Sequence, residues 1–194
     1  METQIKKRAE IDDVAAALKQ EKVVAFPTET VYGLGVIYDS VAAVERLIEA
    51  KQRDMSKRFT LMLSDKEELD EYVYVSYRDQ LIIDKFMPGD ITVILNSKKE
   101  EGTIGIRIPD DVFVRELIRK TGKPLYVTSA NISHRPSTTT TKEVLEQLNG
   151  RIPFVVEGEC GKLQASSVVD LTTDEIKILR QGRITIEMIE EELK

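Results

Sequence analysis

The sequence places four cations within eight residues, opposed there only by Asp54: Lys51, Arg53, Lys57 and Arg58. Lysine supplies a point charge and arginine a planar fork for two oxygens, so this cluster suits a basic cleft for an anion such as phosphate. The alternative is a solvated basic helix end, because cations interact favourably with a helix C-terminus. The net charge of −6 and the pI of about 5.1 argue against a surface built to wrap a nucleic acid. A local basic cleft remains compatible with both values.

A second group of polar residues follows a short apolar run at 23–26. Pro27 ends the hydrogen-bond ladder of the strand that we expect there, and Thr28 and Tyr32 lie in the turn that follows. Small-molecule sites in α/β sheets lie at such carboxyl ends of strands. An ordinary strand-to-helix connection, in which Thr28 caps a helix and the glycines only turn the chain, is the structural alternative. Tyr32 could form part of the wall of such a site, but an aromatic residue at this spacing is equally compatible with a place in the core.

Three further residues have the same double interpretation. Ser129 and Asn131 follow a strand expected at 125–128 and offer short hydroxyl and amide groups, although such a tripeptide is also a common turn or cap. Arg107 lies between isoleucines in TIGIRIP, where strand alternation directs it either to solvent or into a cleft.

Cysteine and histidine chemistry is largely excluded. Cys160 and His134 are the only residues of their types, so an internal disulfide, a cysteine-cluster metal site and the usual zinc sites are not available. Neither residue has a sequence neighbour that would complete a Ser-His-Asp or Cys-His set. We therefore expect Cys160 to be a buried or incidental thiol.

The elements that must position these residues alternate along the chain. We expect helices at 11–20, 40–51, 65–72, 76–86, 111–120, 141–148 and 185–193. Strands are expected at 22–26, 59–63, 91–95, 103–108, 125–128, 153–156, 168–171 and 176–179. This alternation predicts an α/β fold with a mixed sheet, and 194 residues suit one domain. Because no signal peptide or membrane-spanning run is present, we expect a cytoplasmic protein with no membrane association.

Several short motifs occur in a fixed order after the segment PTETVYGLG. They are KQR at 51–53, MPGD at 87–90, IRIP at 106–109, TSAN at 128–131, Ser166 within SSVVD, and ILRQG at 178–182. In content and order these motifs resemble the YrdC/Sua5 family, over roughly residues 10 to 183. The resemblance implies a single YrdC-like domain over 1–194, with a twisted sheet of parallel and antiparallel strands, flanking helices and a large concave cleft.

The resemblance also implies an activity. The family contains L-threonylcarbamoyladenylate synthases, nucleotidyltransferases that make threonylcarbamoyl-AMP and pyrophosphate from L-threonine, bicarbonate and ATP for the t6A modification of tRNA. Such a site needs cations for a triphosphate, a docking point for a carboxylate and small polar groups that align the carbamate with the α-phosphorus. Mg²⁺ is expected to arrive with ATP rather than on protein side chains. The product is expected to pass to a threonylcarbamoyl transferase complex.

Residue roles follow from the motifs that match the family. The nucleotide-binding residues implied in this way are Lys51, Arg53, Lys57, Ser129, Asn131 and Arg180. Lys51 and Arg53 are also expected to be catalytic through the phosphates, so that alanine at either position would slow pyrophosphate release and hardly change thermal stability. The threonine-binding residues implied are Thr28, Tyr32, Arg107 and Ser166. Arg107 is expected to pair with the threonine carboxylate or with the nearby triphosphate.

Four positions depart from the usual family pattern. Asp54 and Arg58 replace a proline and a proline or glycine, which alters the backbone and charge of the basic loop and weakens the assignment of Lys57. His134 replaces a glycine and enters left-handed conformations less freely. Ala165 stands where relatives often have a glutamate. The sequence leaves open how these changes affect activity.

Two other functions fit parts of the pattern. A ribosome-assembly or RNA-binding module without catalysis would use the same basic cleft, and direct contact of RNA with this cleft stays open as well. Aromatic residues are only 6% of the chain and tryptophan is absent, whereas single-strand RNA readers commonly present aromatic stacking platforms. A carbamoyl-adenylate step in hydrogenase maturation belongs to much longer chains with parts that these 194 residues lack.

Overall fold

Ten strands form one mixed sheet in the residues that the computed structural model describes, which are 2–54, 58–161 and 164–194. The first half of the sheet contains β1 (Gln4–Lys6), β2 (Val24–Phe26), β3 (Gly33–Ile37), β7 (Leu125–Ser129) and β8 (Phe154–Val156). The second half contains β4 (Thr60–Met62), β5 (Ile91–Asn96), β6 (Thr103–Arg107), β9 (Ser167–Asp170) and β10 (Lys177–Arg180). The order across the sheet is β1-β8-β2-β3-β7-β4-β6-β5-β9-β10.

Strand β4 joins the two halves. It pairs antiparallel with β7 and parallel with β6, so that Thr60 lies opposite Val127 on one side and Gly105 on the other. Parallel and antiparallel pairs both occur elsewhere in the sheet as well. The predicted single α/β domain with a mixed sheet is therefore confirmed.

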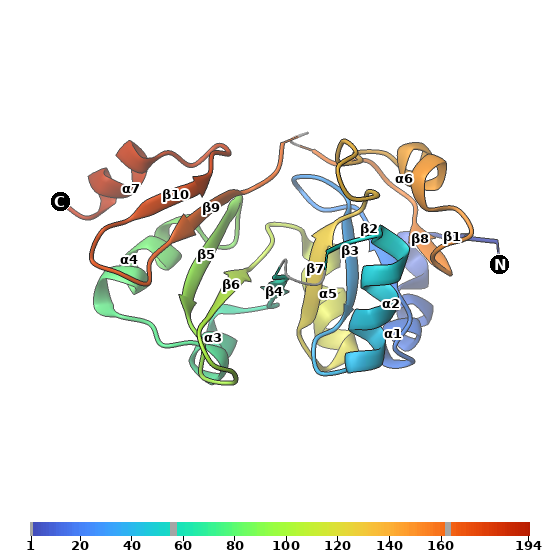
Figure 1. The fold of residues 1–194 in the computed structure, drawn as a ribbon, viewed down its shortest axis with the longest axis horizontal. Helices are drawn as coiled ribbons and strands as arrows, with labels where there is room; N and C mark the ends of the chain where they lie inside the picture. The colour runs from blue at the N-terminus through green and yellow to red at the C-terminus, as the bar shows by residue number, and fades with distance from the viewer. Residues whose placement is uncertain (1, 55–57, 162–163) are drawn as a thin grey trace.

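Helices surround both halves of the sheet (Figure 1). The first half carries α1 (Ile11–Lys19), α2 (Val41–Lys51), α5 (Val112–Thr121) and α6 (Thr141–Leu148). The second half carries α3 (Leu69–Tyr72), α4 (Tyr77–Phe86) and α7 (Ile186–Glu192). Short 3₁₀ helices at Arg8–Glu10 and Lys66–Glu68 precede α1 and α3, so the predicted helix 65–72 is divided into two short pieces.

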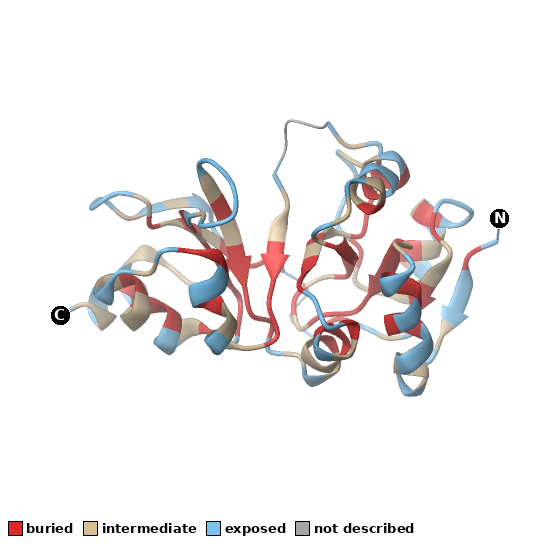
Figure 2. Ribbon diagram, turned by 90° about the horizontal axis from the view of Figure 1, so that it is seen from below, coloured by how far each residue is buried: buried red, intermediate tan, exposed pale blue. Residues whose placement is uncertain are grey.

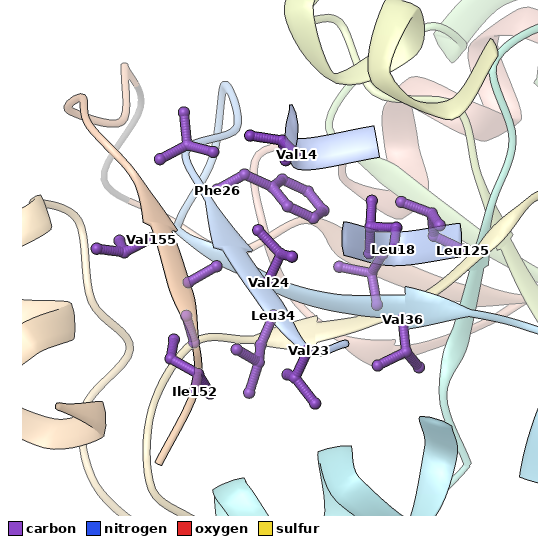
Figure 3. Close-up of a cluster of buried hydrophobic side chains, with 14 of the residues drawn as sticks. Val14, Leu18, Val23, Val24, Phe26, Leu34, Val36, Leu125, Ile152 and Val155 are labelled. Carbon is purple, nitrogen blue, oxygen red and sulfur yellow. The ribbon is translucent and has the colours of Figure 1, made fainter. Parts of the chain in front are cut away.

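Each half has its own hydrophobic core. Val14, Leu18 and Phe26 are fully buried in the first, and Figure 3 shows the Phe26 ring of β2 directed towards the two α1 side chains. Ile82 and Ile106 are fully buried in the second core, between the sheet and α4. Figure 2 shows the result, with buried residues on the strands and exposed residues on the outer faces of the helices.

Two strands lie outside the predicted set, and one of them changes how the opening motif is understood. The strand-to-helix connection, which was the structural alternative after Pro27, does not form, because the chain returns as β3, antiparallel to β2. Gly33 and Gly35 do not turn the chain; they lie within β3, where a Cβ at Gly35 would come within 2.8 Å of the Phe26 ring. Strand β1 at the N-terminus was also missed, because only three residues take part and none of them is buried.

The second half of the sheet has one face packed on its core and one face that helps to form a cavity. Alternate residues point to opposite faces of a strand. Leu61, Ile104 and Ile106 belong to the buried core, whereas Gly105 and Arg107 of β6 lie on the cavity side. This alternation settles the orientation of Arg107, which the sequence left open.

Candidate functional site

A cavity of about 350 Å³ lies where the two halves of the sheet meet. Its lining includes these residues that the sequence predicted: Thr28, Tyr32, Arg53, Arg107, Ser129, Ser166 and Arg180. Among the described lining residues, none is acidic and four are arginines: Arg53, Arg58, Arg107 and Arg180. An acidic protein thus concentrates positive charge at one concave place, which is the arrangement that attracts an anionic ligand.

The β2–β3 turn brings threonine hydroxyls to the cavity. The Thr28 hydroxyl donates to Val31 O over 2.8 Å and accepts from Thr30 N over 3.1 Å, so it holds the turn closed. Its oxygen also lies 3.0 Å from the Thr30 hydroxyl. Both side chains are buried, and Thr28 lines the cavity. These contacts fix the position of Thr28 at the wall before any ligand arrives.

Arg107 extends from the end of β6 to the same turn. Its Nη2 donates to Glu29 Oε1 over 2.7 Å and to Thr30 Oγ1 over 2.9 Å. Glu29 Oε1 also accepts from Asp110 N over 2.9 Å. The Arg107 and Glu29 side chains are 8% and 9% exposed, so this is a buried ion pair that links the two halves of the sheet.

Ser166 and Arg180 form a second polar group, supplied by the segments around β9 and β10. Arg180 donates from Nε to Ser166 O over 3.0 Å and from Nη2 to Ser166 Oγ over 3.1 Å. Ser166 Oγ lies 3.0 Å from the Thr92 hydroxyl of β5. Burial lowers the pKa of Arg180, and the charge of Arg107 lowers it further. The two arginines are therefore near enough to repel each other, and a shared anion would relieve this repulsion.

Arg53 reaches the cavity from the segment after α2. Its guanidinium donates to Thr128 Oγ1 over 3.3 Å and to Arg58 O over 2.9 Å, and it lies 5.0 Å from the centre of the Phe59 ring. Burial lowers its pKa. Two neutral oxygens and an aromatic face thus help to orient this cation at the cavity wall.

Lys51 occupies a different environment. Its side chain is 2% exposed, and its Nζ donates to Ser129 O over 2.6 Å and to the backbone and side-chain oxygens of Asn131 over 2.9 Å each. Neither Lys51 nor Asn131 is among the residues that line the cavity. Both residues are therefore placed to fix the backbone that carries Ser129. Their direct contact with nucleotide stays a prediction, as does that of Lys57, which lies outside the described residues.

Tyr32 belongs both to the cavity wall and to the hydrophobic core, the two places that its sequence position allowed. It lines the cavity, yet it is fully buried. Its hydroxyl lies 2.9 Å from Thr141 Oγ1 and donates to Gly158 O over 2.8 Å or to Val156 O over 2.9 Å. Burial raises the pKa of this hydroxyl to about 12. The ring supports the wall, and its polar end joins β3 to the α6 region.

Sequence reasoning missed several members of this site. Glu29 and Thr30 were part of the quoted motif but had no role, and Thr92 was hidden in the apolar strand 91–95. Arg58 was discounted as a departure, yet it lines the cavity and its Nη1 donates to Thr103 O and, over 2.9 Å, to Thr103 Oγ1. Side chains alternate between the two faces of a strand, so Thr92 points to the opposite face from Ile91 and Val93. This alternation was the signal that could have identified it.

His134 has a left-handed backbone conformation, which the glycine common in the family at this position would adopt easily. Its φ is 68°, in the left-handed region that disfavours a side chain. Replacing His134 by glycine is expected to increase the free energy of unfolding by up to about 1 kcal/mol, because the steric cost of the side chain disappears. Thermal melting measures this effect. The same change at Arg135, whose φ is not positive, should lower the melting temperature; equal effects at both positions would contradict the explanation.

Three further findings concern residues outside the cavity. Cys160 is buried, as predicted, and burial raises the pKa of its thiol to about 11. In the part of the chain that the structure describes, no cluster of three or more His, Cys, Asp and Glu residues is placed to hold a metal ion. Among the same residues, no helix has the length and apolar character needed to cross a membrane.

Comparisons with known proteins agree on one family. The family model Sua5_yciO_yrdC, described as "Telomere recombination", matches residues 16–182. The chain is 35% identical to a Bacillus subtilis protein named threonylcarbamoyl-AMP synthase, over 93% of this chain and 56% of that protein. It is 34% identical to a Vibrio campbellii protein of the same name, over 88% of this chain and 98% of that protein. Among solved structures, P. abyssi Sua5 complexed with L-threonine has a TM-score of 0.93 and 30% identity, over 98% of this chain and 61% of that chain.

This chain covers a different share of the length of each of these relatives. The chain spans nearly all of the Vibrio protein but only about six tenths of the B. subtilis and P. abyssi chains. The family model covers the β2–β3 turn, the four cavity arginines and the segment with Ser166. From this agreement of sequence and fold, the chain belongs to the Sua5/YciO/YrdC family.

Proposed function

We propose that this chain is an enzyme of the nucleotidyltransferase class that forms threonylcarbamoyl-AMP and pyrophosphate from L-threonine, bicarbonate and ATP. The observation that carries the proposal is the cavity itself. Four arginines and several short hydroxyl side chains line one concave site in a chain similar to proteins named threonylcarbamoyl-AMP synthase. The P. abyssi relative has been solved with L-threonine, which agrees with an amino-acid substrate.

The reaction requires little covalent work from the protein. The threonine amine and bicarbonate form a carbamate with loss of water, and a carbamate oxygen then attacks the α-phosphorus of ATP. The bond between the α-phosphorus and the bridging oxygen to the β-phosphate breaks, and pyrophosphate leaves. Mg²⁺ enters with ATP as part of the substrate. The protein aligns the reactants and stabilises the charge that develops on the phosphates.

The cavity wall carries groups that suit the triphosphate and the amino acid. Arg53 and Arg180 approach it from different segments and are positioned by neutral oxygens, so they suit the triphosphate. Arg107 at the end of β6 and Thr28 in the β2–β3 turn both line the cavity, where they suit the threonine carboxylate and its neighbouring groups. The product is a mixed anhydride and would pass to a threonylcarbamoyl transferase for t6A formation on tRNA. A non-catalytic RNA-binding module is not favoured, because the similar proteins are named as enzymes.

ATP consumption is expected to require both L-threonine and bicarbonate. Pyrophosphate release from purified protein with ATP and Mg²⁺, measured together with the AMP adduct, tests this requirement. Alanine should not replace threonine, because polar groups that bind the hydroxyl would be left unpaired. Serine should compete at a cost of about 1 to 3 kcal/mol for the missing methyl group.

Two results would contradict the proposal. Equal turnover with alanine would remove the threonine assignment. RNA binding without any pyrophosphate release in the presence of all three substrates would favour the RNA-binding alternative instead.

A further inference from the structure

The Glu29 carboxylate is a buried charge that the reaction described above does not use. It lies at the tip of the β2–β3 turn, and its side chain is 9% exposed. It is not among the residues that line the cavity, so a ligand there meets Arg107 rather than Glu29. An ionised carboxylate in such a place is costly unless it is paired and hydrogen-bonded, and Arg107 and the Asp110 amide supply these bonds.

The contacts of Arg107 show what this pair does to its guanidinium. Thr30 and Glu29 both accept from Nη2, which ties one corner of the planar fork to the turn. Among the described residues, Arg107 Nε and Glu29 Oε2 are buried without hydrogen-bond partners. One is a donor and the other an acceptor, and Nε shares an edge of the guanidinium with Nη2. A small rotation would therefore pair them in a two-bond arrangement on this edge. In either arrangement the Nη1 side of the fork is not used by Glu29.

We infer that Glu29 is a positioning residue that holds Arg107 through Nη2 and so presents the remaining side of the guanidinium to the carboxylate of the amino-acid substrate. This inference rests on the proposed function and adds a residue to it. An arginine side chain has many rotamers, and a partner that fixes one of them reduces the ordering that substrate binding must impose. Glu29 also places a negative charge beside Arg107, which makes this corner of the cavity less attractive to a triphosphate than the corner of Arg180.

If Glu29 positions Arg107, the length of the side chain at position 29 should affect threonine affinity more than its charge does. Glu29→Gln keeps an oxygen that accepts from Arg107 Nη2 and the Asp110 amide, whereas Glu29→Asp keeps the charge but is one methylene shorter. Glu29→Ala removes both properties. Affinity for L-threonine should therefore fall about tenfold in Glu29→Ala, less in Glu29→Asp and by no more than about threefold in Glu29→Gln.

Calorimetric titration of L-threonine and of a non-hydrolysable ATP analogue into each variant provides the test. The ATP analogue should bind all three variants within about twofold of the unchanged protein, or more tightly. A double variant with Arg107→Ala should bind threonine no more weakly than Arg107→Ala alone, because Glu29 acts through Arg107. Asp79→Ala is the matched control: Asp79 is a buried carboxylate paired with Arg78 over 2.9 Å and lies outside the cavity lining. It should lower the melting temperature and leave threonine affinity unchanged.

The outcomes separate this inference from the proposed function. Failure of the unchanged protein to bind threonine refutes the proposed function and the inference with it. Threonine binding that is equal in the unchanged protein and Glu29→Ala, additive losses in the double variant, or an equal loss of threonine and ATP affinity each refutes the inference alone. Should Glu29→Ala not fold, the order of Glu29→Gln above Glu29→Asp in threonine affinity decides it, and the reverse order overturns it.

Discussion

Replacing Arg53 by alanine is expected to reduce the rate of pyrophosphate release by a factor of about 10² to 10³. The guanidinium lies on the cavity wall, oriented by Thr128, the Arg58 carbonyl and the Phe59 ring. A cation that is already in place when charge develops on the phosphates lowers the barrier without reorganisation. Steady-state assay of pyrophosphate with saturating threonine and bicarbonate measures the effect. Because Arg53 is not part of either hydrophobic core, the melting temperature should change little.

Two comparisons sharpen this prediction. Arg53→Lys should remain impaired, since a planar fork is replaced by a point charge. Arg119→Ala removes a half-exposed arginine that pairs with Asp65 outside the cavity lining, and it should leave the rate unchanged. A normal rate in Arg53→Ala, or a melting loss large enough to account for the lower rate, would show that Arg53 has a structural role instead.

Lys51→Ala should behave differently from Arg53→Ala, although both residues belong to the same KQR motif. Its ammonium binds three oxygens of Ser129 and Asn131 in a buried place. Removing it leaves these acceptors without their donor, at a cost of about 1 to 3 kcal/mol in the free energy of unfolding. Activity and melting temperature should therefore fall together. The sequence alone predicted an unchanged melting temperature for both Lys51→Ala and Arg53→Ala. Differential scanning calorimetry of the two variants decides between this expectation and the one from the structure.

Replacing Arg107 by alanine should weaken threonine binding by a factor of about 10 to 100, because a charge-assisted hydrogen bond in a buried site is lost. Ser129→Ala should mainly weaken binding of an ATP analogue, by a factor of about 5, because a neutral hydrogen bond contributes only about 1 kcal/mol. Titration calorimetry with both ligands on both variants measures the separation. The expected result would assign Arg107 to the amino acid and Ser129 to the nucleotide.

Stability must be followed in the same experiment. Arg107→Ala leaves the buried Glu29 carboxylate without its cation, so the melting temperature should fall as well. The comparison is made at a temperature where both proteins are folded. Intact threonine affinity in Arg107→Ala, with damage only to nucleotide binding, would place Arg107 with Arg53 and Arg180 in the phosphate group.

The sequence by itself determined the alternation of helices and strands, and through the ordered motifs it indicated the family and seven of the residues that line the cavity. Hydrophobic periodicity is local, so elements such as α2, α5 and β6 could be predicted near their observed bounds. The end of α5 followed from Gly122, which takes the left-handed conformation at the helix C-cap. Strand β3 could not be found in this way, because the glycines that let it pack against Phe26 have the composition of a turn.

Tertiary structure decided which side of each element a polar residue occupies and which residues meet. Lys51 and Arg53 are two positions apart, yet Lys51 is buried against the end of β7 and Arg53 lines the cavity. Arg107 and Glu29 are 78 residues apart and form a buried ion pair only because β6 and the β2–β3 turn come together. Propensity and periodicity are properties of neighbouring residues, whereas burial and pairing depend on contacts between distant parts of the chain. For this reason the motifs indicated the kind of chemistry, and only the fold decided where each side chain lies.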